Sequence, residues 1–163
     1  MELSADLPAE LVPLAWLIGR WEGAGVVGYP TIDPLNFGQE IEFAHVGKPF
    51  LAYTSATWLI DDDGNRVRPL ASETGYWRPR PGGMLEVTVA HPTGFVEIWV
   101  GTAGGGKIEL RTDLVARTES AKEYTAGHRL YGLVEGDLLW AFDMAAMGLP
   151  LQSHVSARLK RVA

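Results

Sequence analysis

Apolar and polar residues alternate along most of the chain after its first 19 positions. Runs rich in β-branched and aromatic residues are separated by the turn sequences DDDGN, RPRPGG, HPTG, TAGGG and VEGD. This alternation is typical of strands with one buried face, and such turns are typical of hairpins. The pattern predicts ten strands, at residues 20–28, 38–46, 50–60, 68–78, 84–91, 95–102, 107–117, 122–134, 137–145 and 151–162.

The segment PAELVPLAWLIG near the start of the chain has a different spacing. Leu11, Leu14, Ala15 and Ile18 recur at helical intervals, and Gly19 is a residue that commonly ends a helix. We therefore expect one short N-terminal helix before the first strand.

Ten short strands joined by tight turns predict an all-β meander. A meander of this length protects its edge strands best by closing into a barrel, so we expect a ten-stranded antiparallel up-and-down β-barrel. A two-sheet sandwich fits the same pattern. The length favours one domain, residues 1–163. A barrel with about this number of strands can enclose one small ligand.

Strand parity indicates which side chains face the barrel interior. In IEFAHVG the expected inward residues are Ile41, Phe43 and His45. In two later strands the expected inward residues are Leu138, Trp140, Phe142 and Met144, and Ile108, Leu110, Thr112 and Leu114. A single inward histidine is more often a hydrogen-bonded core residue than a ligand, so the residues alone favour that role for His45.

The last predicted strand, LQSHVSARLKRV, contains His154. Plain alternation places Leu151, Val155, Ala157 and Leu159 on the inner face and His154 on the outer face. His154 faces inward only if a β-bulge shifts the phase or if the interior is partly polar at this point. The pattern alone does not select it as a ligand.

The composition excludes several classes of function. The 163 residues are 47% hydrophobic and 21% charged, and the formal net charge is −6. An acidic chain lacks the basic patch that nucleic acids require, and no apolar run is long enough to span a bilayer. The first residues lack the basic opening of a secretory signal. We therefore expect a cytoplasmic protein that binds neither nucleic acids nor membranes.

The lack of cysteine limits the metal chemistry. Disulfides, zinc–thiolate sites and iron–sulfur clusters are excluded. A metal or a haem has to be held by histidine, methionine, tyrosine or carboxylates. The chain contains four histidines, His45, His91, His128 and His154.

Two motifs resemble ligand-binding loops but lack the required context. GAGVVG, residues 23–28, matches the dinucleotide motif G-x-G-x-x-G, but the following YPTIDP cannot continue a helix. DDDGN, residues 61–65, resembles the start of a calcium loop, but Ser72 stands where the bidentate glutamate is needed. We interpret the second as an acidic hairpin turn. No G-x-S-x-G elbow supports a hydrolase.

The motif GRWEGAG, residues 19–25, precedes and enters the first strand. Trp21 is large enough to close one end of a barrel, and Gly23 and Gly25 permit close backbone contact. The residues alone give this motif a packing role. Together with YPTIDP, EFAHVGKPFLAYTS, SETGYWR, AHPTGFVEI, AKEYTA and GLPLQSHVSARL, it makes nearly the whole chain resemble the actinobacterial nitrobindins, which are haem-binding β-barrels.

The resemblance implies a ten-stranded barrel related in shape to the fatty-acid-binding proteins, with one ferric haem b near its mouth. It implies that His154 on the last strand is the ligand of the iron. It also implies that His45 lies on the distal side, that Lys122 pairs with a haem propionate, and that Thr31 lines the pocket.

The activity implied by the resemblance is isomerisation of peroxynitrite to nitrate, with binding of nitric oxide at the open iron position. A non-catalytic carrier or sensor of haem or of another small apolar ligand is the main alternative, because a fold does not fix a function. A structural protein with a filled barrel is a further alternative. We expect small molecules as partners, and the exposed strand faces also allow a homodimer.

Overall fold

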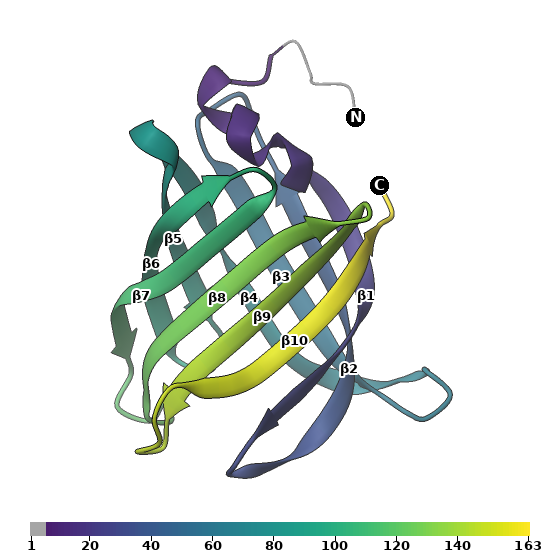
Figure 1. Cartoon of the computed structure of the whole chain (residues 1–163). Helices are drawn as coiled ribbons and strands as arrows, with labels where there is room; N and C mark the ends of the chain where they lie inside the picture. Colours follow the sequence, from purple (N-terminus) through teal and green to yellow (C-terminus); the bar gives the residue numbers. More distant parts are fainter. Residues whose placement is uncertain (1–5) are drawn as a thin grey trace.

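The computed structural model describes residues 6–163 and shows a closed antiparallel β-barrel (Figure 1). Each strand pairs with the next along the chain, and β1 pairs with β10 to close the barrel. The expected barrel is therefore confirmed, and the sandwich is not formed. The strands are β1 (Gly19–Tyr29), β2 (Ile32–Ala44), β3 (Leu51–Ile60), β4 (Arg66–Arg80), β5 (Met84–His91), β6 (Phe95–Gly104), β7 (Lys107–Arg117), β8 (Tyr124–Val134), β9 (Asp137–Ala146) and β10 (Gln152–Arg161).

The largest difference from the expected strand bounds is in β2, which begins six residues before the expected start at residue 38. Pro34 lies in this added part of the strand, and proline has no N–H for a ladder bond. In the structure the pairing of β1 with β2 shifts between Val27 and Tyr29, and Pro34 lies opposite this irregularity with no paired residue. The strand therefore passes through Pro34 without losing a hydrogen bond.

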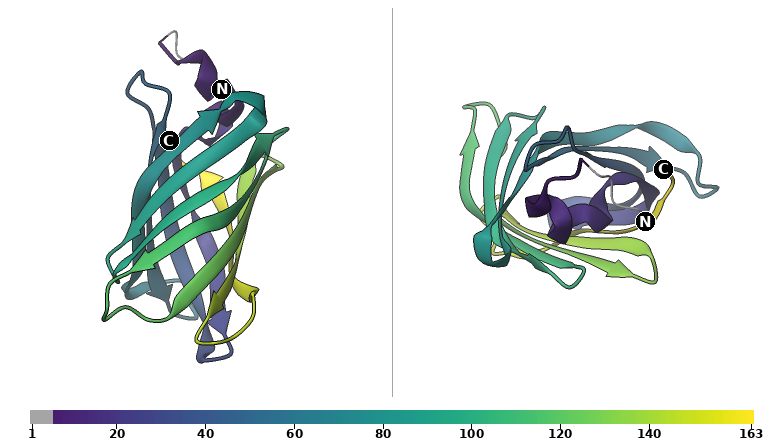
Figure 2. Two further views of the ribbon diagram at one scale, coloured as in Figure 1. Left: turned by 90° about the vertical axis from the view of Figure 1, so that its left-hand side faces the viewer. Right: turned by 90° about the horizontal axis from the view of Figure 1, so that it is seen from above.

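The expected N-terminal helix is a 3-10 helix, η1 (Ala9–Leu17), and it covers one end of the barrel (Figure 2). Pro13 lies inside it and lacks the N–H that an α-helical bond would need. Trp21 is fully buried below η1, and its indole N–H donates to the Leu17 carbonyl oxygen at 2.8 Å. The expected closing role of Trp21 is therefore confirmed. A second short 3-10 turn, η2 (Pro81–Gly83), joins β4 to β5.

The glycines of GRWEGAG allow β1 to lie close to β10. A Cβ atom at Gly23 would stand 2.1 Å from the Arg158 carbonyl oxygen, and one at Gly25 would stand 2.2 Å from that of Ser156. No side chain fits at such distances. GAGVVG is therefore part of a strand that glycine makes possible, and it forms no nucleotide-binding loop.

Strand parity predicts most of the core correctly. Ile41, Phe43, Leu138 and Trp140 are all buried, as expected. Leu114 was expected inside, but 53% of its surface is exposed. The cause is a register shift in the pairing of β6 with β7, between Ile98 and Trp99. It reverses which side chains face inward near the end of β7, where Leu114 lies.

The end of the barrel opposite η1 is formed by the turns after β1, β3, β5, β7 and β9 (Figure 1). The turn after β3 contains DDDGN, and Asp61 ties it together by accepting hydrogen bonds from the backbone N–H groups of Asp63 and Asn65. This confirms the hairpin interpretation. In the part of the chain that the structure describes, no helix is long and apolar enough to cross a membrane.

Candidate functional site

A cavity of about 480 Å³ opens at the end of the barrel opposite η1. This volume lies within the range of roughly 300–1,000 Å³ that is typical of small-molecule pockets. Its apolar lining includes Val27, Phe37, Phe142, Met144 and Val155. Its polar lining includes His154, His91, Glu73, Glu97 and Arg129. Apolar walls with a few convergent polar groups are typical of a ligand site.

A larger groove, of about 1130 Å³, crosses β1, β7, β8, β9 and β10. It is more open than the cavity, and its lining within residues 6–163 includes neither histidine nor methionine. The groove therefore offers a haem iron no imidazole and no thioether, and the cavity is the better candidate site.

His154 enters the cavity because β10 contains a bulge at this residue. The pairing of β10 with β9 joins Ser153 to Asp143 and then Val155 to Phe142, so His154 has no partner of its own. A bulge of this kind lets two successive residues face the same side. His154 and Val155 both line the cavity, whereas plain alternation placed His154 outside. The β-bulge that His154 needs in order to face inward is therefore present.

One ring nitrogen of His154 is fixed by the backbone. Its Nδ1 lies 3.0 Å from the carbonyl oxygen of Gly28. A carbonyl oxygen can only accept, so Nδ1 carries the proton and donates it. In the neutral ring, Nε2 then bears the lone pair that a metal ion needs. The hydrogen bond to Gly28 thus selects the neutral tautomer in which Nδ1 carries the proton and Nε2 carries none.

Aromatic rings hold the imidazole from two sides. Tyr29 and Phe142 both contact it edge to face, with ring centroids 5.6 Å and 5.5 Å away. Tyr29 is itself anchored, because its hydroxyl donates to the Met144 carbonyl oxygen and accepts from the Ala146 N–H. The orientation of His154 is therefore set before any ligand binds.

The surroundings of His154 favour its neutral form. Burial lowers the pKa of the imidazole below its usual 6.5, and the positive charge of Arg129 lowers it further. The hydrogen bond to Gly28 acts in the opposite direction without cancelling these effects. At neutral pH the ring is consequently able to coordinate a metal ion.

Thr31 and Lys122 both contribute to the cavity lining at its rim. Thr31 lies in the turn between β1 and β2, and Lys122 lies in the turn between β7 and β8. Both side chains are exposed. The structure therefore brings these two expected residues together with His154 around one opening.

His45 lies elsewhere. It follows the last residue of β2, in the loop to β3, and its Nδ1 accepts a hydrogen bond from the Gly47 N–H. Gln39 is the last residue of β2 that lines the cavity, and six more residues of strand correspond to about 20 Å. His45 is at the end near η1 and outside the cavity lining. The geometry does not support the expected distal role, nor the expected core position.

A buried ion pair forms part of the inner wall. The guanidinium group of Arg129 donates two hydrogen bonds to Glu73, at 2.7 Å and 3.1 Å, and the Tyr53 hydroxyl donates to the same carboxylate. Burial alone would raise the pKa of Glu73, but Arg129, His91 and these hydrogen bonds hold it at about 2. Arg129 also lies over the ring of Phe142, at 4.6 Å from its centroid.

His91 and Glu97 complete this wall. His91 Nε2 contacts Glu97 Oε1 directly, and the Tyr124 hydroxyl donates to Glu97 Oε2 at 2.5 Å. Sequence reasoning did not select these residues. The available signal was Glu97 itself. In FVEIWV it shares the inward parity of Phe95 and Trp99, and a carboxylate inside a barrel rarely lacks a partner. Its inward position therefore indicates a polar partner nearby.

The donor set fits a haem. His154 supplies one oriented neutral imidazole, most of the cavity wall is apolar, and Lys122 supplies a cation at the rim. Within residues 6–163, no group of three or more histidine or acidic residues is arranged to hold a bare metal ion. A single axial histidine in an apolar cavity is instead the arrangement of many haem proteins.

Comparisons with known proteins agree with this arrangement. Residues 10–161 match the family model of the THAP4-like, heme-binding beta-barrel domain. The chain is 55% identical to a ferric nitrobindin-like protein of Kineococcus radiotolerans, with 99% of this chain and 98% of the relative covered. It is also 55% identical to a peroxynitrite isomerase of Nocardioides sp., with 98% of each chain covered.

A solved structure is similar as well. The crystal structure of Rv2717c from M. tuberculosis matches with a TM-score of 0.87 and 42% identity, over 96% of this chain and 99% of that one. The fold, the cavity with its histidine and the matched family model lead to one conclusion. The chain belongs to the family of THAP4-like, heme-binding beta-barrel domains.

Proposed function

We propose that this chain is a peroxynitrite isomerase that binds one ferric haem b through His154 and converts peroxynitrite to nitrate. Nitric oxide is a second small ligand of the same iron position. The observation that carries the proposal is the oriented, neutral imidazole of His154, which enters a cavity with largely apolar walls. The relatives named peroxynitrite isomerase, at 45–55% identity over nearly their whole length, support the reaction.

Bound haem supplies the redox and Lewis-acid chemistry of such a reaction. The chain would hold the iron through Nε2 of His154 and would fix the orientation of that imidazole. The hydrogen bond from Nδ1 to Gly28 keeps the proton on that nitrogen and increases the electron density at Nε2. The edge contacts of Tyr29 and Phe142 resist rotation of the ring.

Lys122 and Thr31 have supporting roles at the rim. Lys122 would pair its ammonium group with a haem propionate, and Thr31 would complete the lining on the β1–β2 side, roles supported by the presence of both residues in the cavity lining. The apolar walls exclude bulk water from the interior and strengthen the few polar interactions that remain there.

A non-catalytic carrier or sensor of haem is the second candidate function, and the apolar walls suit it equally. A barrel filled by side chains does not fit, because the cavity is present. Stopped-flow mixing of peroxynitrite with the haem-loaded protein separates the first two candidates. The isomerase forms nitrate faster than buffer and faster than the haem-free chain, whereas a carrier forms it at the rate of buffer.

Two further expectations stay predictions. The chain is expected to work in the cytoplasm, and the exposed strand faces allow a homodimer. Sedimentation of the haem-loaded protein at several concentrations measures the second directly.

A further inference from the structure

His91 and His154 stand on opposite walls of the same cavity. In the closed order of ten strands, β5 and β10 are separated by five steps in either direction, which is half of the barrel. His91 is the last residue of β5 and His154 the third residue of β10, and both are near the end opposite η1. Within residues 6–163 they are the histidines that line the cavity.

His91 is held by two carboxylates that come from the neighbouring strands. Its Nε2 contacts Glu97 of β6, and its Nδ1 is 3.7 Å from Oε2 of Glu73 in β4. The second distance is too long for a hydrogen bond. Nδ1 makes no hydrogen bond within the described chain, so it remains able to donate to a ligand in the cavity.

The charges around His91 balance only if the cluster holds one more proton. Glu73 and Glu97 supply two negative charges, and Arg129 supplies one positive charge. Glu97 is only 2% exposed, and a buried carboxylate is costly unless a positive charge or a proton compensates it. His91 lies between both carboxylates and is the natural holder of that proton. The hydroxyls of Tyr53, Tyr124 and Tyr131 surround the cluster and add no positive charge.

His91 also has access to the outside. The pairing of β4 with β5 ends at Thr74 and Ala90, so the strands separate just beyond this pair. A groove of about 630 Å³ lies there, and it shares Ser55, Ser72, Glu73 and His91 with the cavity lining. The cluster can therefore exchange its proton with solvent without passing through the cavity mouth.

We propose that His91, whose Nε2 contacts Glu97, donates a hydrogen bond from Nδ1 to the nitrogen-oxide anion bound in the cavity and so positions peroxynitrite opposite His154. This inference rests on the proposed function. It assigns to His91 the role on the open side that the family resemblance implies for His45. An anion that enters apolar surroundings needs such a donor close by. The net charge of −6 provides no long-range attraction in its place.

The test uses the haem-loaded full chain with two probes that report a hydrogen-bond donor without turnover. Azide binds the ferric form as a small anion, and the infrared C–O stretch of the reduced carbon monoxide complex reports polarity on the open side. We expect His91→Leu to weaken azide binding about tenfold or more, since a hydrogen bond to a charged group is lost. The C–O stretch should move to higher frequency. His91→Gln, which keeps a donor, should lie between His91→Leu and wild type.

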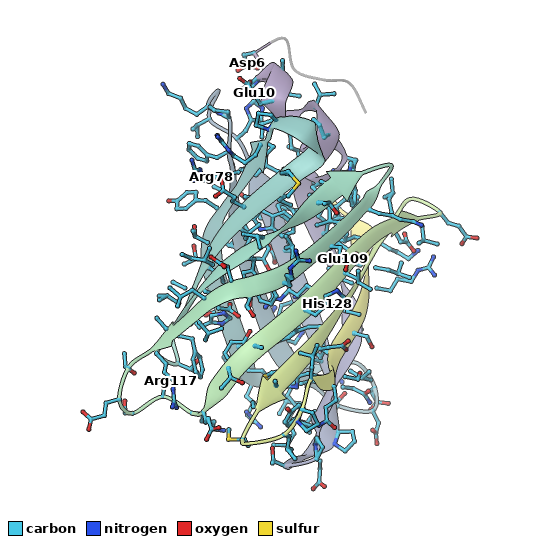
Figure 3. The ribbon with its side chains drawn as sticks, turned by 60° about the vertical axis from the view of Figure 1, so that its left-hand side comes forward. Asp6, Glu10, Arg78, Glu109, Arg117 and His128 are labelled. Atoms are coloured by element: carbon cyan, nitrogen blue, oxygen red, sulfur yellow. The ribbon has the colours of Figure 1, made fainter. Side chains whose placement is uncertain are left out.

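His128 provides a matched control. It also pairs with a glutamate, because its Nε2 lies 3.1 Å from Glu109 Oε1, but this pair lies on β8 and β7 outside the cavity lining (Figure 3). His128→Leu should leave both probes unchanged. If His91→Leu does not fold, Glu97→Gln decides, since it removes the negative charge that contacts His91 Nε2 and preserves the side-chain volume. It should shift both probes in the same direction.

The outcomes separate this inference from the proposed function. Normal hemin uptake in the His91 and Glu97 variants, with azide affinity and C–O stretch as in wild type, overturns the role of His91 and leaves the haem site standing. A wild-type chain that takes up no hemin overturns both.

Discussion

The imidazole Nδ1 of His154 donates to the carbonyl oxygen of Gly28, 3.0 Å away, at the point where β10 and β1 stop pairing. The last pair of these strands is Val27 with Val155, so the Gly28 carbonyl is left free to accept from a side chain. Two irregularities meet here, the bulge of β10 against β9 and the register shift of β1 against β2. Together they turn a closing strand into the wall of a ligand site.

The lowered pKa of His154 predicts how hemin affinity depends on pH. Burial, with the charge of Arg129, lowers the pKa below 6.5, so the ring is neutral above this value and stays neutral somewhat below it. Affinity should be constant above about pH 6.5 and should fall only when protons compete for Nε2 below the lowered pKa. Hemin titrations at several pH values measure this. The residual binding of His154→Ala is the control and should lack the step.

The Glu73–Arg129 pair predicts a large stability effect. Arg129→Met leaves a buried carboxylate without its cation and should reduce the free energy of unfolding by about 3–5 kcal/mol. Glu73→Gln combined with Arg129→Met should recover much of this loss, because no buried charge is left in the pair. Urea unfolding of the haem-free chains measures both. A double variant as unstable as Arg129→Met would show that packing, and not charge, is responsible.

The same pair predicts a pH dependence of stability. The pKa of Glu73 is about 2 in the folded chain and 4.5 in the ordinary carboxyl. Its contribution is therefore fully present above pH 4.5 and is lost as the pH falls toward 2. The double variant should lack this component of acid unfolding, which is followed by circular dichroism at equal urea concentration.

The close approach of β1 to β10 at Gly25 predicts a second destabilising substitution. A Cβ atom there would meet the Ser156 carbonyl oxygen at 2.2 Å, so Gly25→Ala has to separate β1 from β10 and should cost about 1–3 kcal/mol. Gly132→Ala is the control, because a Cβ at that position meets no atom within 4 Å. Equal unfolding midpoints for the two variants would contradict the close approach of the strands.

His45→Leu tests where the open side of the haem lies. Since His45 is near η1 and outside the cavity lining, this change should leave both hemin affinity and nitric oxide association unchanged. Flash photolysis of the nitric oxide complex measures the association rate. A clear change in that rate, with hemin affinity preserved, would restore the distal role that the family resemblance implies.

The barrel can be predicted from the sequence because the alternation of apolar and polar residues recurs in strand after strand, with turn sequences between them. Each inward residue, such as Ile41 or Trp140, adds to the same pattern. Local irregularities are not readable in this way. Register shifts reversed the phase at Leu114 and at His154, and neither bulge has a distinctive residue of its own. His91 and Glu97 lie in one hairpin, where Val89 pairs with Glu97 and His91 with Phe95. They were missed because alternation indicates which side of the sheet a residue faces, but not which polar side chains contact each other there.

The most direct measurement is a hemin titration followed by absorbance, on wild type, His154→Ala and His128→Ala in parallel. We expect a saturating Soret band at one haem per chain for wild type and for His128→Ala, because the His128 side chain lies beside Glu109 outside the cavity. The band should be lost or shifted in His154→Ala. The same saturating band in His154→Ala, or no specific band in wild type, would contradict the assignment of His154 as the iron ligand.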